Sequence, residues 1–424
     1  MPTTAAPSRP PALGPGHGDP RLDAIRAKAL TGERLSMEDG RVLYETPDIW
    51  SLCEIADEVR QRLNPGVGYY NINRHLNYSN ICALSCTFCE FHRKKGDEGA
   101  YTRSLDEVRA EALRAVESGA TEMHIVGGLQ PHLPFEYYTD MLRAIRESAP
   151  GLHLKAFTAV EIVHLARIAK VMKNDDRKAS IRWVLERLLE AGLGSLPGGG
   201  AEVFDDRVHD EAFKGKIRSD VWLDVHRVAH ELGLNTNATI LYGHIEQRDE
   251  RLVHMDMLRS AQDEALARLG YAADGSGAIT LTREGVRPPT PAMNDRGGYF
   301  QTIIPLPFFP DGSALERLPG PSGIENLRTL AVARLMLDNF PHVKAFWIMQ
   351  TLAMAQLMLQ SGADDIDGTV VWYDITKVGG ATTHQEVTVP DLQRTIRDAG
   401  FTPVERDTLY RRVTRDGAAW RIAE

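Results

Sequence analysis

Three cysteines lie within eight residues of one another, at Cys82, Cys86 and Cys89. Cysteine thiolates hold iron–sulfur clusters, and a four-iron cluster with three protein ligands keeps one iron open for a small molecule. The spacing therefore predicts a [4Fe–4S] cluster that takes part in catalysis. Zinc is the alternative, because a structural zinc site completes four ligands and His92 is near enough in sequence to supply the fourth.

Composition narrows the class of protein. The chain has 424 residues and a formal net charge of -9, which disfavours binding to nucleic acid. Four cysteines in this length fit a reducing compartment, so we expect a cytoplasmic protein. Residues 1–20 are rich in Pro, Ala and Gly and lack the apolar core of a signal peptide, so a flexible tail is expected. No stretch is apolar enough to predict a membrane span.

Short apolar runs alternate with amphipathic helical segments, which is typical of parallel strands joined by crossover helices. The pattern predicts an α/β fold, a TIM-like (β/α)8 barrel over residues 67–388. A helical extension is expected over 21–66 and an α/β extension over 389–424. A long loop near 267–297 is expected to be a lid, an interaction surface or a disordered segment. The eight expected strands are 68–75, 122–127, 152–158, 193–196, 235–242, 300–306, 343–349 and 366–372.

Helical periodicity and capping signals place the helices between these strands. Ser104 and Glu107 form the pattern of a capping box, in which each side chain satisfies a free backbone donor of the other residue. Gly119 is expected to end that helix. The expected helices are 108–118, 135–148, 181–191, 219–232, 248–269, 323–339 and 351–360.

In such a barrel the active site lies at the C-terminal ends of the strands. Gly127 and Gly128 follow the second strand, where glycine lets the backbone approach a ligand closely; a tight turn is the alternative. Glu161 follows the third strand and could accept hydrogen bonds from ribose hydroxyls or an ammonium group. The macrodipole of a helix would favour a glutamate there as well.

Later strand ends offer further candidates for ligand contacts. The glycine run that contains Gly199 and leads to Glu202 requires unusual backbone angles, a close ligand or a flexible loop. Tyr242 follows the fifth strand, and Pro305 could frame an adenine or simply form a rigid turn. The glycine-rich segment 379–384 is expected to cover the substrate or to be a plain loop.

Together with Phe88 before the third cysteine, these elements resemble the radical S-adenosylmethionine (SAM) superfamily from about residue 69 to 413. The resemblance implies a barrel of the radical SAM type, in which the three cysteines hold the cluster and its open iron binds the methionyl group of SAM. Gly127 and Gly128 would approach the methionyl amine. Five segments resemble the branch of menaquinone and deazaflavin biosynthesis: 70–77, 124–131, 134–138, 197–202 and 242–246.

Within this branch, segment 154–162 is most similar to the aminofutalosine synthases. The resemblance implies that the 5'-deoxyadenosyl group of SAM, a consumed substrate, adds to 3-[(1-carboxyvinyl)oxy]benzoate and gives 6-amino-6-deoxyfutalosine with loss of CO2 or bicarbonate. An external one-electron reductant such as flavodoxin or ferredoxin would be needed. The sister enzymes, cyclic dehypoxanthinyl futalosine synthase and the deazaflavin-forming (7,8-didemethyl-8-hydroxy-5-deazariboflavin) synthase, remain alternatives.

A substrate with carboxylates requires a cation or hydrogen-bond donors. Arg74, His75 and His244 lie near expected strand ends and are predicted to provide them, although both histidines could instead belong to the core. Two other classes stay open. A cluster-bearing electron-transfer or sensing protein would need no substrate cavity, and a zinc-binding scaffold would contain zinc without iron or labile sulfide.

Overall fold

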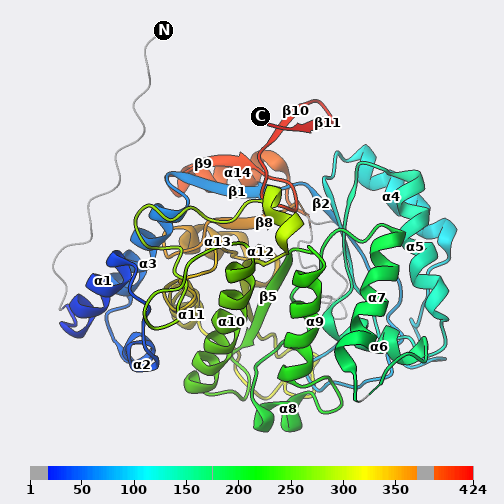
Figure 1. The fold of residues 1–424 in the computed structure, drawn as a ribbon, viewed down its shortest axis with the longest axis horizontal. Coiled ribbons are helices and arrows are strands. Elements are labelled where there is room, and N and C mark those ends of the chain that lie inside the picture. The colour runs from blue at the N-terminus through cyan, green and yellow to red at the C-terminus, as the bar shows by residue number, and fades with distance from the viewer. Residues whose placement is uncertain (1–17, 174, 370–385, 424) are drawn as a thin grey trace.

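The computed structural model describes residues 18–173, 175–369 and 386–423. Most of the expected tail (1–20) and all of segment 379–384 lie outside these ranges. Helices surround a central set of strands (Figure 1). The barrel strands are β1 (Val67–Asn71), β2 (Asn73–Leu76), β3 (Glu122–Ile125), β4 (His153–Ala156), β5 (Thr236–Tyr242), β6 (Phe300–Pro307), β7 (His342–Val343) and β8 (Asp365–Gly368).

The strands join in a parallel ring. Sheets β2-β3-β4 and β5-β6-β7 are parallel, and β8 pairs in parallel with β1, which continues into β2. Single parallel bridges connect these sheets, with Lys155 to Ser195, Leu196 to Thr236 and Lys344 to Asp365. The predicted (β/α)8 barrel is thereby confirmed.

Four expected strands differ from the structure. The run 68–75 is divided at Ile72 into β1 and β2, and the run 366–372 forms a strand only to Gly368, with 370–372 outside the described residues. The run 193–196 contributes only the bridging residues Ser195 and Leu196 to the wall of the barrel. The prediction for 343–349 is wrong after Val343, because helix α12 (Trp347–Gln350) occupies the rest of that run. A short run of apolar residues without alternation fits a buried strand and a buried helix equally well.

The helices mostly follow the expected periodicity. The capping box at Ser104 is present, with the Ser104 N–H donating to Glu107 Oε2 at 2.7 Å. Helices α6 and α8 were not predicted; most residues of α6 are buried, so it has no polar stripe to mark it. Around the barrel lie α4 (Leu105–Glu117), α5 (Phe135–Ser148), α6 (Ala159–Ile168), α7 (Arg177–Ala191), α8 (Asp206–Ala212), α9 (Ser219–Glu231), α10 (Arg248–Arg268), α11 (Gly323–Met336) and α13 (Leu352–Leu359).

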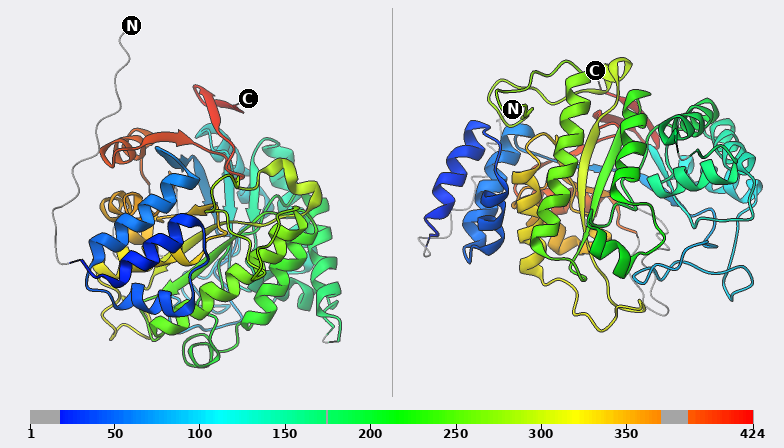
Figure 2. Two further views of the ribbon diagram at one scale, coloured as in Figure 1. Left: turned by 60° about the vertical axis from the view of Figure 1, so that its left-hand side comes forward. Right: turned by 60° about the horizontal axis from the view of Figure 1, so that its bottom comes forward.

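Extensions at both ends of the sequence pack on the outside of the barrel (Figure 2). The N-terminal helices are α1 (Arg21–Thr31), α2 (Met37–Glu45) and α3 (Ile49–Leu63), and α3 packs against α11. The C-terminal part adds α14 (Val389–Asp398), β9 (Thr402–Glu405) in parallel with β1, and the hairpin of β10 (Val413–Asp416) and β11 (Ala419–Ile422). Among the helices of the described ranges, none has the length and hydropathy of a membrane span.

The long loop near 267–297 connects α10 to β6, so it lies at the N-terminal ends of the strands. It contains the 3-10 helix η1 (Pro291–Arg296), and its Leu281 N–H donates to the carbonyl oxygen of Asp338 at 2.9 Å. Arg34, which follows α1, donates to Asp263 and Asp338 and to the carbonyl of Ile279 in this loop. The loop therefore packs against the ends of α10 and α11 and the segment after α1, and none of its residues lines the cavity of the cysteines.

Candidate functional site

The cysteine loop follows β2 and is held open toward the barrel. The N–H of Cys82 donates to the Arg93 carbonyl at 3.0 Å, and Arg93 N–H donates to the Asn80 carbonyl at 2.8 Å. Lys94 Nζ donates to the carbonyls of Cys82 and Leu84, each at 2.9 Å. These contacts join the two ends of the loop and direct its cysteines to one cavity.

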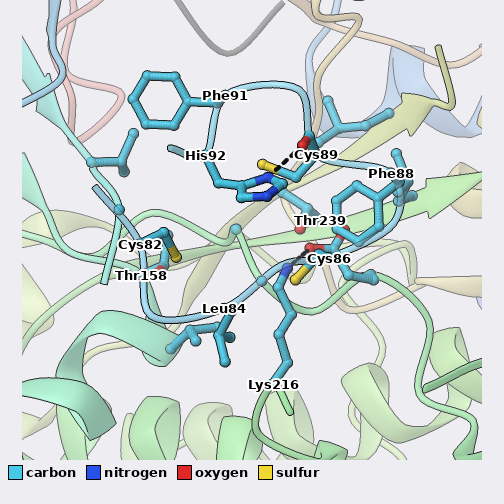
Figure 3. Close-up of a pocket in the computed structure, with 18 of the residues that line it drawn as sticks. Cys82, Leu84, Cys86, Phe88, Cys89, Phe91, His92, Thr158, Lys216 and Thr239 are labelled. Carbon is cyan, nitrogen blue, oxygen red and sulfur yellow. Dashed lines mark hydrogen bonds and ion pairs between the residues drawn. The ribbon is translucent and has the colours of Figure 1, made fainter. Parts of the chain in front are cut away.

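Cys82, Cys86 and Cys89 line a cavity of about 280 Å³ at the C-terminal ends of the strands (Figure 3). Burial raises the pKa of Cys86 to about 11, with the Lys216 ammonium acting in the opposite direction. The N–H of Leu129 donates to Cys82 Sγ at 3.4 Å. Hydrogen bonds to sulfur are a feature that tunes iron–sulfur clusters.

The donor set fits an iron–sulfur cluster better than a single ion. Within the described ranges, no three His, Cys, Asp or Glu side chains converge on a single-ion site, although the three cysteines share one cavity. Three thiols spaced around a cavity suit a cluster with several irons.

The glycine pair lies against the cysteine loop. Gly128 N–H donates to the Ser79 carbonyl at 2.8 Å, and a Cβ on Gly128 would lie 2.4 Å from the Ile81 carbonyl oxygen. A Cβ on Gly127 would lie 2.6 Å from the Tyr78 ring. Both glycines line the cavity. Close packing of two backbones thus explains them, whether or not a ligand is present.

Glu161 also lines the cavity, but both of its carboxylate oxygens already accept hydrogen bonds. Tyr78 OH and Gly127 N–H donate to Oε1 at 2.8 and 3.1 Å, while the N–H and hydroxyl of Thr158 donate to Oε2 at 2.7 and 2.8 Å. Burial raises the pKa of Glu161 to about 7 despite these four donors. Glu161 therefore takes part in the N-terminal cap of α6, and its hydrogen bond with Gly127 connects the glycine pair to this helix.

The glycine run that follows the bridging residues Ser195 and Leu196 reaches the cavity, as expected. Gly199 and Glu202 both line it, and Glu202 has a φ of 48°, a conformation that is uncommon for a residue other than glycine. The Glu202 carboxylate forms an ion pair with Lys216, a residue that the sequence pattern did not single out. Strained backbone of this kind is concentrated at functional sites.

The segment around α8 packs against the outer side of the cysteine loop. The sequence pattern did not predict this contact. The N–H and hydroxyl of Thr87 both donate to the Ala212 carbonyl, at 3.2 and 2.6 Å. The ring of Phe88, which lines the cavity, packs edge-on against Phe213 with centroids 6.1 Å apart. Helix α8 is short, and its role in docking leaves no periodic signal in the sequence.

Five predicted site residues do not line the cavity. Arg74 points outward to α4, where it contacts Glu111 at 2.8 Å, and His244 Nε2 lies 3.1 Å from the Leu241 carbonyl. The others are buried in the barrel wall or interior: Tyr242 OH donates to Asn326 at 2.9 Å, the Pro305 carbonyl accepts from Gln350 at 3.5 Å, and the His75 ring lies 4.5 Å from that of His124.

His124 and Thr239 line the cavity floor, and neither was predicted. Burial lowers the pKa of His124 well below its usual range, so the ring is neutral. Strand alternation could have found His124, because it lies two residues after the buried Glu122 and shares its face of β3. Its Nε2 has no protein hydrogen-bond partner among the described residues.

Comparison with known proteins agrees with this geometry. The model of the radical SAM superfamily matches residues 76–258, and the CofH/MqnC C-terminal region matches 297–417. The chain is 43% identical to an aminodeoxyfutalosine synthase of Thermus thermophilus, over 94% of this chain and 97% of the relative. It is 41% identical to the Streptomyces coelicolor enzyme of that name, over 91% and 92% of the two chains.

More distant relatives include a 5-amino-6-(D-ribitylamino)uracil–L-tyrosine 4-hydroxyphenyl transferase of Methanosphaerula palustris, at 34% identity over 92% of this chain and 97% of the relative. Among solved structures, methylornithine synthase has a TM-score of 0.64 at 15% identity, covering 89% of this chain and 97% of that one. The FeFe-hydrogenase maturase HydG from Carboxydothermus hydrogenoformans has a TM-score of 0.62 at 15% identity, covering 92% and 81%. These two structures support the barrel fold. The chain belongs to the radical SAM superfamily, in the branch that contains the aminodeoxyfutalosine synthases.

Proposed function

We propose that the protein is an aminodeoxyfutalosine synthase of menaquinone biosynthesis. It would transfer the 5'-deoxyadenosyl group of SAM to 3-[(1-carboxyvinyl)oxy]benzoate and release 6-amino-6-deoxyfutalosine, with loss of CO2 or bicarbonate. One observation carries this proposal: three cysteines open onto a glycine-edged cavity in a chain that is 41–43% identical, over most of its length, to two enzymes of that name.

Cys82, Cys86 and Cys89 would hold a [4Fe–4S] cluster. When bound, that cluster supplies the electron that cleaves SAM to methionine and the 5'-deoxyadenosyl group. The backbone of Gly127 and Gly128 borders the cysteine loop and would lie along the methionyl group. The wall on the other side is formed by Phe88, Gly199 and Glu202, which are placed to enclose the rest of SAM.

The floor of the cavity suits an aromatic substrate. Most of the cavity surface is apolar, and an apolar, enclosed site keeps water away from a reactive intermediate. The neutral His124 ring can donate one hydrogen bond to a substrate carboxylate. We therefore assign to His124 the role first expected of Arg74, His75 and His244. The apolar lining residues at this depth are Val126, Leu241, Leu306 and Met349.

The electron would come from an external one-electron protein donor such as flavodoxin or ferredoxin, in the cytoplasm. Four cysteines in 424 residues, with Cys53, Cys82, Cys86 and Cys89 all free thiols, support a reducing compartment. Replacement of dithionite by reduced flavodoxin in the assay, and cell fractionation, would test these two assignments. Activity only with artificial reductants, or protein found outside the cytoplasm, would contradict them.

The decisive experiment is anaerobic incubation of the iron-reconstituted protein with dithionite, SAM and 3-[(1-carboxyvinyl)oxy]benzoate, followed by mass spectrometry. We expect 6-amino-6-deoxyfutalosine together with methionine. Formation of free 5'-deoxyadenosine alone would reject the substrate, and incubation with L-tyrosine and the ribityl pyrimidine would then test the deazaflavin-forming reaction. An intact cluster that cleaves no SAM would favour an electron-transfer protein.

A further inference from the structure

Lys216 is the one lysine or arginine among the described residues that line the cavity. It follows α8 in the segment that docks on the cysteine loop, and its side chain is 13% exposed. Its backbone carbonyl accepts a hydrogen bond from the His209 ring at 3.1 Å, which anchors the residue to α8. Burial of a charge is costly unless it is paired, and Lys216 is paired with Glu202, which lines the same cavity.

Three contacts fix the position of the Lys216 ammonium. It forms an ion pair with Glu202, lies 4.8 Å from the centroid of the Phe88 ring and lies 6.0 Å from that of Phe213. Phe88 directly precedes Cys89, and in Figure 3 Lys216 reaches toward Cys86. The cation is therefore held against the stretch of the loop that carries the second and third cysteines.

The Lys216–Glu202 pair lies beside the cysteines. Lys216 and Cys86 line the same cavity, and the ammonium lies over the ring of Phe88, which directly precedes Cys89. Glu202 partly neutralises this charge through its ion pair with Lys216. Lysine is a cation at neutral pH.

We propose that Lys216 sets the reduction potential of the cluster, with Glu202 as a counter-charge that limits its effect. The inference rests on the proposed cluster site and names a determinant of it. Reduction moves one electron from the external protein donor to the cluster, so the cluster gains one negative charge. A nearby cation stabilises the more negative state more than the oxidised state, which makes the potential less negative.

The test measures the midpoint potential of the reconstituted protein without SAM, by redox titration followed by electron paramagnetic resonance. In Lys216→Met, we expect the ratio of reduced to oxidised cluster at a fixed potential to fall about tenfold, which is about 59 mV for a one-electron couple. Lys216→Arg keeps the charge and is expected to stay near the parent value. Glu202→Gln is expected to shift the ratio in the opposite direction.

Lys28→Met is the matched control, because Lys28 forms its ion pair with Asp39 at 3.0 Å among the N-terminal helices. Its midpoint should not move. Equal potentials in Lys216→Met and the parent, with matched iron and sulfide content, would overturn the proposal, as would shifts of the same sign in Lys216→Met and Glu202→Gln. If Lys216→Met binds no iron, the sign of the Glu202→Gln shift decides.

The potential is measured without the benzoate substrate, so the two proposals fail separately. Unchanged potentials alongside 6-amino-6-deoxyfutalosine formation would reject only the role of Lys216. Shifted potentials in a protein that makes no such product would reject only the substrate assignment.

Discussion

The two ends of the barrel interior are built in opposite ways. At the C-terminal ends of the strands, the cysteine loop surrounds a cavity whose thiols have few protein partners. Deeper in the barrel, the interior is filled by charged side chains that pair with one another. The buried pairs are Lys155 with Glu122 at 2.5 Å, Lys344 with Asp367 at 2.9 Å and Arg406 with Asp365 at 2.6 Å.

This difference separates the roles of the two ends. Buried charges that pair with one another have less capacity left for a ligand than unpaired groups have. Thiols and backbone groups at the other end retain that capacity, as expected for the catalytic end of a TIM-like barrel. Substitutions at the cysteine end should therefore affect chemistry first, and substitutions at the opposite end should affect stability first.

The largest expected effect is at Cys86. In Cys86→Ser, cluster content and formation of 6-amino-6-deoxyfutalosine should fall to the level of the assay blank, because one of three thiolate ligands is lost. Cys53→Ser is the matched control, since Cys53 is buried in α3 and does not line the cavity. Iron and sulfide analysis and mass spectrometry measure both. Full cluster content in Cys86→Ser would contradict the assignment of the ligands.

Gly128→Ala tests the contact between the glycine pair and the cysteine loop. The new Cβ would meet the Ile81 carbonyl oxygen, so the loop must shift, and a displacement of about 1 Å can lower a rate by about a hundredfold. Gly275→Ala, in the loop at the N-terminal ends of the strands, is the control because a Cβ there meets no atom within 4 Å. If Gly128→Ala and Gly275→Ala had comparable kcat/KM values, the contact between Gly128 and the cysteine loop would not be important for the reaction.

Asp338→Asn probes the opposite end, at the N-terminal ends of the strands. Asp338 accepts from Arg34 at 3.0 Å and from the hydroxyl of Thr280 at 3.0 Å, and it is buried. We expect the free energy of unfolding to fall by about 2–3 kcal/mol, because a charge-assisted hydrogen bond is weakened in a buried site. Denaturant titration measures it. A loss of kcat without a loss of stability would show that this end takes part in the reaction.

The smallest effect concerns the pH dependence of stability. Burial raises the pKa of Glu161 to about 7, so its contribution is complete below the unfolded value near 4.5 and is lost as pH rises through 7. Glu161→Gln should remove that slope, which is at most about one proton per unfolding event. Urea titrations at several pH values measure it. Parallel curves for the parent and the variant would show that Glu161 does not titrate in this range.

Much of this architecture could be predicted because it leaves a regular pattern. The run 300–306 is short and rich in apolar and β-branched residues, and 135–148 has helical periodicity, and the structure places β6 and α5 there. The cysteine spacing and the strand-end glycines led to residues that line one cavity. Apolar runs without alternation, as at 343–349, could not be assigned from sequence.

Other features of the site were not predictable because they depend on contacts between distant segments. Lys216 resembles any surface lysine until α8 docks its segment on Thr87 and Phe88. Arg74 and His244 lie at strand ends, but Arg74 pairs with Glu111 and the His244 ring contacts the Leu241 carbonyl, and neither residue lines the cavity. The position of a residue along a strand predicts its depth better than the partner that its side chain finds in the fold.

The position of β1 has a consequence for the order in which the chain can fold during its synthesis. β1 lies between β8 and β9, so Val67 pairs with Thr402 and Tyr69 with Asp365. The ribosome releases β1 early. The backbone groups on both edges of this strand stay unpaired until β8 and β9 have been translated. Exposed strand edges readily pair with other chains. Ring closure must therefore follow translation of β8, and the second edge of β1 is covered only after translation of β9. A chaperone that shields β1 until then would be expected to increase the yield of folded enzyme.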